Sequence, residues 1–196
     1  MRILMVTDAW RPQVNGVVHT LERLAETLKS FDVAADFLTP NIFRTLPLPT
    51  YPDIRLALTT PGHVARLIEA GKADHIHIVT EGPLGIMARR YCRNAGRPFT
   101  TSYHTRFPEY LSARLPVPES WAYRWLRDFH NSGQGTLVAT QSLADDLSAR
   151  GFNKLRPWTR GVDTDHFRPD KRKDLGFPGP VFLCVGRVAI EKNLPA

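Results

Sequence analysis

The chain has 196 residues, of which 42% are hydrophobic and 23% charged, and its formal net charge is +7. This length suits one sizeable α/β domain, alone or with the start of a second, and the composition argues against an intrinsically disordered chain. No apolar run approaches the ~18 residues of a membrane span, and the N-terminus turns polar at Thr7-Asp8, too early for a signal peptide. The two cysteines, Cys92 and Cys184, lie far apart, which argues against a disulfide framework or a zinc site and favours the cytoplasm.

The basic excess is spread along the chain rather than gathered into a tail or a stripe. Nucleic-acid-binding proteins usually concentrate such charge and interleave it with aromatic residues. We therefore expect no nucleic-acid partner. We interpret the charge as a mildly basic face for anionic substrates or for an anionic lipid surface.

Strand patterns and helix patterns alternate from the first residue. Short apolar runs predict strands over residues 2–7, 33–38, 54–58, 75–79, 99–103 and 136–140, with a loop between the second and the third. Helical spacing predicts helices over residues 17–28, 61–71, 84–95, 119–131 and 143–150, three of which stop at Gly71, Gly96 and Gly151. This alternation is typical of βαβ units, so the expected fold class is α/β with a doubly wound, mainly parallel Rossmann-like sheet.

The composition changes near the C-terminal end. Residues 161–180 are rich in proline and charged side chains, which is typical of a linker. We expect a Rossmann-like, acceptor-side domain at residues 1–168, an interdomain linker at 169–180 and a fresh strand at 181–185. One strand and one loop cannot form a domain, so residues 181–196 are interpreted as the start of a truncated C-terminal domain.

In a sheet of this kind, ligands bind beyond the carboxyl ends of the strands. The loop after the first strand lacks the G-x-G-x-x-G spacing, which argues against a nicotinamide or flavin enzyme. It ends in Asn15-Gly16 at a helix N-terminus, where backbone N–H groups and the helix dipole favour an anion. An equally good interpretation is that Asn15 caps the helix and Gly16 relieves a tight turn.

Two further strand ends carry polar residues. Glu81 follows the fourth strand and either binds sugar hydroxyls or, as we slightly favour, complements the N-terminus of the next helix. His104 follows the fifth strand with Tyr103 and Arg106 close by, and histidine can act there as a general base or donate a hydrogen bond to a sugar. We favour a functional role for His104 over that of a structural residue at a strand end.

Other histidines have less evident roles. His75 and His77 share one face of a strand, but no third ligand presents itself, so no metal is expected. His130 has no evident partner and is interpreted, with the remaining histidines, as a surface or packing residue.

Charged and aromatic groups on two helices also have two interpretations each. A solvated face is favoured over an anionic-lipid contact for four arginines on one helix, Arg89, Arg90, Arg93 and Arg97. Trp121 and Trp125 are four residues apart, which favours core packing over a membrane-facing or acceptor-facing role. Arg187 and Lys192 follow a strand and a glycine, where they suit the clamping of a diphosphate nearly as well as they suit exposed cations.

Seven segments together carry a resemblance to a known family. They are Pro12-Gln13-Val14-Asn15-Gly16-Val17, Glu81-Gly82-Pro83-Leu84-Gly85, Tyr103-His104-Thr105-Arg106-Phe107-Pro108-Glu109-Tyr110, Arg160-Gly161-Val162-Asp163, Phe167-Arg168-Pro169, Val185-Gly186-Arg187 and Glu191-Lys192-Asn193. Taken in order, these segments resemble family 4 of the retaining glycosyltransferases. The resemblance runs from end to end of the chain, and jointly its motifs are specific. The segment around His104 is most similar to that of glycolipid and phosphatidylinositol mannosyl- and glucosyltransferases.

The resemblance implies the two-domain GT-B architecture and a retaining transfer of a hexose from a UDP- or GDP-sugar to a lipid or glycan acceptor. It implies neither cofactor nor metal, because Arg187 and Lys192 would neutralise the leaving phosphates. Gly16 would approach the donor diphosphate, and His104 would lie beside the transferred sugar. The other residues expected to bind substrate are Asn15, Glu81, Tyr103 and Arg106.

The acidic donor-binding motif of this family lies downstream of Ala196, so we expect the chain to be an incomplete portion that is inactive alone. A GT-B epimerase is a poorer match because of residues 161–163 and 191–193. The alternative of another class is a non-catalytic Rossmann-like module that binds a lipid, a glycan or a partner subunit. Further expectations are a peripheral contact with the inner face of the membrane and self-association through an exposed domain interface.

Overall fold

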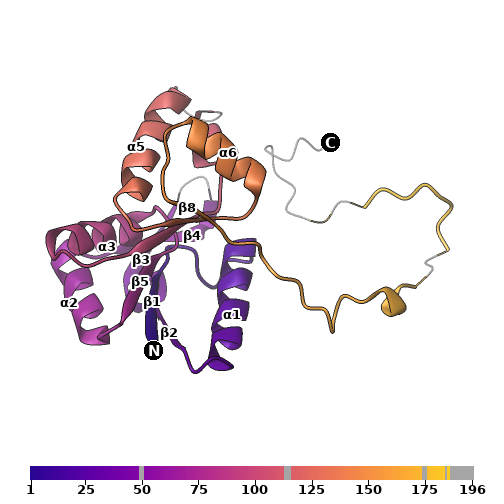
Figure 1. The fold of residues 1–196 in the computed structure, drawn as a ribbon, viewed down its shortest axis with the longest axis horizontal. Coiled ribbons are helices and arrows are strands. Elements are labelled where there is room, and N and C mark those ends of the chain that lie inside the picture. Colours follow the sequence, from indigo (N-terminus) through magenta and orange to yellow (C-terminus); the bar gives the residue numbers. More distant parts are fainter. Residues whose placement is uncertain (49–50, 113–115, 174–175, 184, 186–196) are drawn as a thin grey trace. The chain divides into compact units, whose positions relative to one another are not determined.

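A computed structural model describes residues 1–48, 51–112, 116–173, 176–183 and 185 of the chain (Figure 1). The chain divides into two units, Met1–Thr159 and Arg160–Ala196, and all its described strands and α-helices belong to the first. The strands are β1 (Arg2–Val6), β2 (Ala34–Leu38), β3 (Arg44–Leu48), β4 (Tyr51–Leu58), β5 (His75–Ile78), β6 (Thr100–Tyr103), β7 (Thr136–Val138) and β8 (Leu155–Pro157). The α-helices are α1 (Gly16–Lys29), α2 (Pro61–Gly71), α3 (Pro83–Asn94), α4 (Phe107–Ser112), α5 (Glu119–Asn131) and α6 (Gln141–Ala149).

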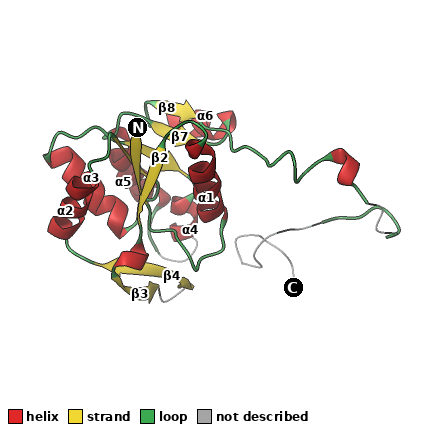
Figure 2. Cartoon of the chain, turned by 90° about the horizontal axis from the view of Figure 1, so that it is seen from below, coloured by secondary structure: helices red, strands yellow, loops and turns green. Residues whose placement is uncertain are grey.

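The central sheet has six strands in the order β2-β1-β5-β6-β7-β8, and every neighbouring pair is parallel. The chain leaves β1 through α1 to β2 on one side, and later returns to β5 on the other side of β1. Helix α1 covers one face of this part of the sheet, and α2 and α3 cover the opposite face (Figures 1 and 2). The expected α/β class with a doubly wound, parallel sheet is therefore confirmed.

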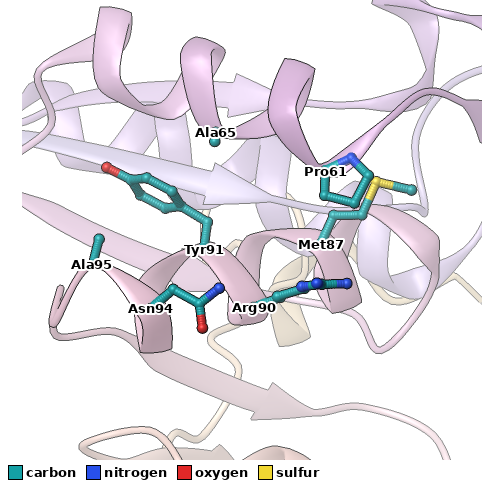
Figure 3. A pocket seen from close by; sticks show the side chains of 7 residues that line it. All are labelled: Pro61, Ala65, Met87, Arg90, Tyr91, Asn94 and Ala95. Carbon is teal, nitrogen blue, oxygen red and sulfur yellow. The ribbon is translucent and has the colours of Figure 1, made fainter.

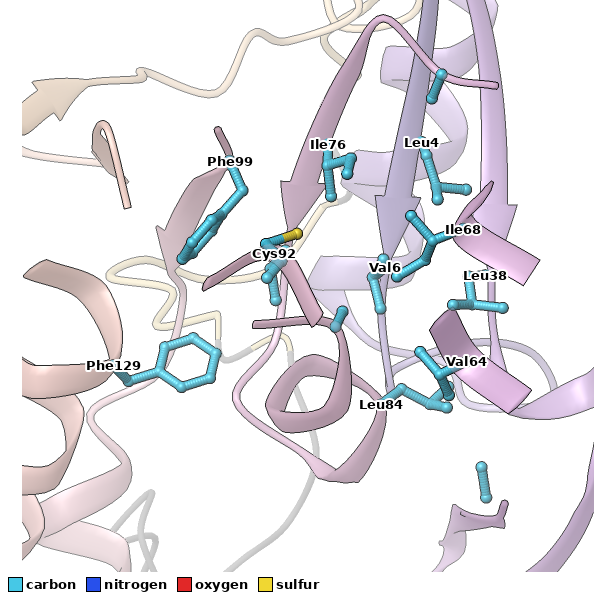
Figure 4. Packing of buried hydrophobic residues seen from close by; sticks show 14 residues of the cluster. Leu4, Val6, Leu38, Val64, Ile68, Ile76, Leu84, Cys92, Phe99 and Phe129 are labelled. Carbon is cyan, nitrogen blue, oxygen red and sulfur yellow. The ribbon is translucent and has the colours of Figure 1, made fainter. Parts of the chain in front are cut away.

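The alternation of side chains along β1 explains the two layers of helices. Leu4 and Val6 point to the face where α2 and α3 lie, and they join the largest buried cluster (Figure 4). Met5 points to the other face and packs against Leu21 of α1. Because successive strand residues face opposite sides, an apolar run buries both faces at once. Full burial of one such side chain is worth about 2 kcal/mol.

The ends of the helices follow local capping rules. The side chains of Asn15, Thr60 and Thr140 accept hydrogen bonds from the first-turn N–H groups of α1, α2 and α6. Gly96 and Gly151, expected as helix stops, have positive φ angles of 63° and 84°. Helix α2 ends at Gly71, as expected, and the left-handed residue that follows it is Lys72, with φ of 44°.

The largest departure from expectation lies between residues 44 and 58. Residues 54–58 were expected to be a strand of the main sheet after a loop; they belong instead to β4, which pairs antiparallel with β3 in a separate two-stranded sheet. Pro47 lies inside β3, and proline lacks the N–H that an interior strand of a larger sheet requires. A two-stranded hairpin tolerates it because each strand has one unpaired edge.

Strand β8 was not anticipated. It has three residues, ends in proline and pairs only with β7 at the edge of the sheet. Such a segment is too short for a period of two residues to be recognised.

In the second unit, Pro169–Lys171 forms a short 3-10 helix. Residues 181–183 and 185 are exposed and lie outside any strand, so the strand expected at 181–185 is not formed in this structure. A strand needs a neighbour to satisfy its backbone groups. The expected domain boundary after residue 168 stays a prediction.

Candidate functional site

The candidate site lies at the carboxyl edge of the central sheet. Strands β1, β5 and β6 are consecutive neighbours, so the loops that follow them emerge side by side. The chain reverses its direction of winding between β1 and β5, and ligands of doubly wound sheets bind at such a switch point. These loops bring Asn15-Gly16, Glu81 and His104 to one edge of the fold.

The junction between β1 and β5 is organised by Asp8. Its Oδ1 accepts a hydrogen bond from the N–H of Leu84 at 2.9 Å, and its Oδ2 accepts from the N–H of Gly85 at 3.3 Å and from the hydroxyl of Thr80 at 2.9 Å. Burial raises the pKa of Asp8, and these hydrogen bonds act against that rise. The carboxylate that accepts from the first N–H groups of α3 is thus that of Asp8, and the predicted interaction of the Glu81 charge with this helix end stays a prediction.

The glycines beside Glu81 have a packing role. A Cβ atom on Gly82 would lie 2.4 Å from Cγ of Asp8, and one on Gly85 would lie 1.9 Å from the carbonyl oxygen of Thr80. Real Cβ atoms do not approach so closely, so both positions require glycine. Residues 82 and 85 of the Glu81–Gly85 motif therefore bring α3 close to Asp8 and β5.

Glu81 has a different partner. Its Oε1 lies 3.1 Å from Nε2 of His130, while Nδ1 of His130 lies 2.9 Å from the hydroxyl of Thr101. His130 is 1% exposed, whereas 21% of the Glu81 side chain is exposed. The expectation that His130 has no partner is wrong, because the partners come from positions 81 and 101, far along the chain.

Asn15 caps helix α1, as one of its two interpretations expected. Its Oδ1 accepts hydrogen bonds of 3.0 Å from the N–H groups of Val17 and Val18, and its Nδ2 donates to Oε1 of Gln13 at 3.0 Å. Gly16 is the first residue of the helix and is exposed. The cap leaves exposed backbone at the helix N-terminus, where an anion is favoured; the predicted contact of Asn15 and Gly16 with a donor diphosphate stays a prediction.

His104 is half-buried at the end of β6. Its ring centroid lies 5.9 Å from that of Trp158, and the two rings meet edge to face. Tyr103 is 2% exposed and packs in a buried cluster with Tyr123, so it lies beneath the site rather than on its surface. Burial raises the pKa of the Tyr103 hydroxyl.

Arg106 is exposed, and its charge is balanced locally. Its guanidinium lies 3.2 Å from Oε1 of Glu109 and 3.4 Å from Oδ2 of Asp146. The hydroxyl of Tyr123 donates to the same Glu109 oxygen at 2.7 Å. These contacts connect the start of α4 to α5 and α6, so they hold the segment that follows His104.

His77 is buried and His75 is exposed. The Nδ1 and Nε2 atoms of His77 each lie 2.8 Å from a hydroxyl, those of Thr100 and Ser102. Burial lowers the pKa of His77 to about 4, so the ring is neutral at physiological pH. Among the described residues, no group of three histidine, cysteine, aspartate or glutamate side chains is arranged to hold a metal ion.

The solvated face expected for four arginines is confirmed for three of them, since Arg90, Arg93 and Arg97 are exposed. Arg89 differs: its side chain is 16% exposed and donates to Asp128, to the carbonyl of Phe129 and to the hydroxyl of Ser132, so it fastens α3 to α5 instead of facing water. Trp121 and Trp125 are 62% and 43% exposed, so they are not core residues. The core face of α5 is formed by other residues, which include Ala122, Tyr123, Leu126 and Phe129.

Several features lie apart from these loops. A hollow of about 330 Å³ lies between α2 and α3, and none of the candidate site residues lines it (Figure 3). Its lining residues are Pro61, Ala65, Met87, Arg90, Tyr91, Asn94 and Ala95. Arg187 and Lys192 lie outside the described residues. No helix within the described ranges is both long enough and apolar enough to cross a membrane.

Comparison with known proteins gives one matching family model, described as Glycosyltransferase Family 4, over residues 14–166. A GDP-mannose-dependent alpha-mannosyltransferase of Mycobacterium tuberculosis is 25% identical over 99% of this chain and 58% of its own length. A mannosyltransferase of the same name from Corynebacterium glutamicum is 26% identical over 99% of this chain and 53% of its own length. The sulfoquinovosyl transferase SQD2 of Arabidopsis thaliana is 31% identical over 77% of this chain and 32% of its own length. The chain therefore spans about half the length of the two mannosyltransferases that it matches.

Proposed function

The chain belongs to glycosyltransferase family 4, and we propose that it is the acceptor-side half of an enzyme that transfers a hexose from a nucleotide-diphosphate sugar to a lipid or glycan acceptor. The observation that carries this proposal is the meeting of three loops at the switch point of the sheet. One loop offers a capped helix N-terminus at Gly16, one a partly exposed carboxylate at Glu81, and one a half-buried imidazole at His104. Together they provide a site for an anion, a carboxylate that can accept a hydrogen bond from a hydroxyl group, and a side chain able to move a proton.

The proposed donor is GDP-mannose, with UDP-hexoses as alternatives. Support comes from the names of relatives, since three are GDP-mannose-dependent alpha-mannosyltransferases. A fourth, alpha-monoglucosyldiacylglycerol synthase of Streptococcus pneumoniae, is 24% identical over 51% of its length, and its name supports a lipid acceptor.

The proposed reaction breaks the bond between the sugar and the diphosphate, and the anomeric configuration is retained. Negative charge develops on the departing diphosphate, so cationic side chains lower the barrier. We assign this role to Arg187 and Lys192, and in this scheme they make a metal or cofactor unnecessary. His104 would hydrogen-bond the transferred hexose, and Gly16, the first residue of α1, would approach the diphosphate.

The chain alone is proposed to be inactive, because it spans only about half of the mannosyltransferases it matches. The test is a transfer assay with GDP-[14C]mannose, UDP-[14C]glucose, lipid extracts and octyl glycosides. We expect transfer by the full-length protein that carries this chain, none by residues 1–196 alone, and a loss of at least about tenfold in a full-length His104→Ala variant. Turnover by the isolated chain contradicts the proposed inactivity. If the full-length protein binds acceptor without transferring sugar, the binding-module alternative is correct.

We also propose a peripheral membrane contact through α5, on the cytoplasmic side. The exposed Trp121 and Trp125 lie one helical turn apart, and Arg124 between them is exposed. Tryptophan favours the membrane interface and arginine favours anionic headgroups. Co-sedimentation with anionic vesicles is expected to fall several-fold in a Trp121→Ala/Trp125→Ala double variant. Equal binding by the unaltered and double-variant chains would disprove the contact.

Self-association of the isolated chain is proposed through the surface that its second half would cover. Size-exclusion chromatography of residues 1–196 checks this, and a monomer at high concentration counts against it.

A further inference from the structure

His130 is the only described side chain that hydrogen-bonds Glu81. It lies in the last turn of α5, and its side chain has no exposed surface. Its ring centroid lies 5.6 Å from that of Tyr103, 5.2 Å from that of Phe129 and 5.9 Å from that of Phe152. Aromatic walls on several sides leave the ring few orientations, so its two nitrogen atoms point in fixed directions.

The hydrogen bonds of this ring form a chain with one consistent direction. A carboxylate accepts hydrogen bonds only, so the proton on His130 must lie on Nε2, which faces Oε1 of Glu81. In the neutral ring Nδ1 then accepts from the hydroxyl of Thr101 at 2.9 Å. The Thr101 hydroxyl in turn lies 3.0 Å from that of Thr136, which donates to it. Both threonines have no exposed surface, so water does not compete for these contacts.

The hydrogen bonds from Thr136 to Glu81 occupy only one of the two carboxylate oxygens of Glu81. Among the described residues none hydrogen-bonds Oε2 of Glu81, and 21% of the side chain is exposed. We propose that His130 is a positioning residue. Its Nε2–H holds Oε1 of Glu81 at the carboxyl end of β5, so that Oε2 accepts a hydrogen bond from a hydroxyl group of the sugar or of the acceptor.

The ligand that this geometry fits is a polyhydroxylated one. A carboxylate with one oxygen held and one free is a directional hydrogen-bond acceptor, and the hydroxyl group of a sugar is its natural donor. The identity of this ligand rests on the proposed hexosyl transfer, whereas the direction of the hydrogen bonds from Thr136 to Glu81 does not.

The first experiment reads the position of the proton directly. In the 15N-labelled chain of residues 1–196, two-bond 1H–15N correlations of the His130 ring are expected to show a protonated Nε2. Nδ1-only protonation removes the contact with Glu81 and overturns the proposal. With 13C-labelled glutamate, the Cδ resonance of Glu81 is expected to move in His130→Asn and to stay close to its original position in His130→Gln.

The second experiment uses the same pair of variants, because each amide keeps one of the two ring contacts. The nitrogen of glutamine falls near Nε2 and still donates to Glu81, whereas that of asparagine falls near Nδ1 and reaches only Thr101. With the full-length protein, GDP-mannose and octyl α-D-mannopyranoside, we expect His130→Asn to lower kcat/KM for the acceptor by about tenfold or more. His130→Gln is expected to restore most of it.

His77 supplies the matched control. It is also buried and has two hydrogen-bonding ring nitrogens, but both face hydroxyls and neither faces a carboxylate. His77→Gln and His77→Asn are therefore expected to differ little in transfer. If the two His130 variants lose activity and melting temperature equally, His130 has only a packing role and the proposal is wrong.

Hexosyl transfer and the positioning of Glu81 by His130 can be disproved independently of each other. A full-length protein that transfers no hexose disproves the proposed function, and the NMR signatures alone then decide whether His130 positions Glu81. A protein that transfers hexose but lacks those signatures keeps its function and loses the positioning role.

Discussion

Asp8 and Glu81 follow neighbouring strands of the central sheet, and the structure uses their carboxylates differently. Both oxygens of the buried Asp8 accept hydrogen bonds, from the N-terminus of α3 and from Thr80. Glu81 is partly exposed, and within the part of the chain that the structure describes it accepts through one oxygen, from His130. A carboxylate whose two oxygens both accept hydrogen bonds within the protein stabilises the fold, whereas one with a free oxygen is available for a ligand.

The two buried histidines show the same contrast. His77 contacts the hydroxyls of Thr100 and Ser102, and His130 connects a hydroxyl to a carboxylate at the edge of the sheet. The two histidines differ in where they and their partners lie. His77 lies within β5, whereas Glu81, the partner of His130, lies beyond the end of that strand.

The largest effect is expected where α3 meets the loop that carries Asp8. In Gly85→Ala the new Cβ would overlap the carbonyl oxygen of Thr80, so α3 must move away from the Asp8 carboxylate. We expect a loss of about 3 to 4 kcal/mol in the free energy of unfolding, measured by urea denaturation. Gly62→Ala in α2 is the control, since its Cβ would meet no atom within 4 Å. Equal stabilities of the two variants would contradict the close packing of α3.

The free energy of unfolding is expected to depend on pH because of His77, the buried histidine whose partners are both hydroxyls. Burial lowers the folded-state pKa of His77 to about 4 from its ordinary 6.5. As the pH falls below 6.5, His77 becomes protonated in the unfolded chain, whereas in the folded chain it stays neutral until about pH 4. Stability is therefore lost across that window, by about 3 kcal/mol from this residue. Urea denaturation between pH 7 and pH 4 is expected to show a shallower decline in His77→Gln; parallel curves would disprove the assignment.

Removal of the Asp8 carboxylate tests its structural role. Asp8→Ala leaves two buried N–H groups of α3 without their acceptor, and we expect a loss of about 2 kcal/mol. Chemical denaturation at pH 7 measures it, with Asp8→Asn as the milder substitution because the amide oxygen still accepts. An unchanged Asp8→Ala variant would show that water replaces the carboxylate.

The smallest effect on stability is expected at Glu81. Glu81→Gln keeps an oxygen that accepts from His130, so the free energy of unfolding is expected to change by about 0.5 kcal/mol or less. Transfer by the full-length protein is expected to fall by about tenfold, because an amide nitrogen, which donates and does not accept, replaces the free oxygen. A large loss of stability with unchanged transfer would make Glu81 structural, like Asp8.

Much of the fold follows from local patterns. The period of the apolar residues places five of the six expected strands in the central sheet, and Gly96 and Gly151 mark the ends of two helices. The hairpin of β3 and β4 escapes such reasoning, since apolar residues in a short strand do not say which strand is its neighbour. The exposed tryptophans escape it too, because a helical stripe does not reveal which face is covered.

For the candidate site too, some features follow from the sequence and others depend on the tertiary structure. The sequence alone determined which residues follow each strand, and hence that Asn15, Gly16, Glu81 and His104 meet at one edge, because parallel strands direct their carboxyl ends the same way. Only the tertiary structure decided how each is used. The partner of Asp8 at Leu84 lies 76 positions away, and the partner of Glu81 at His130 lies 49 positions away. Hydrogen bonds across such separations depend on how helices pack on the sheet, and no local pattern in the chain encodes them.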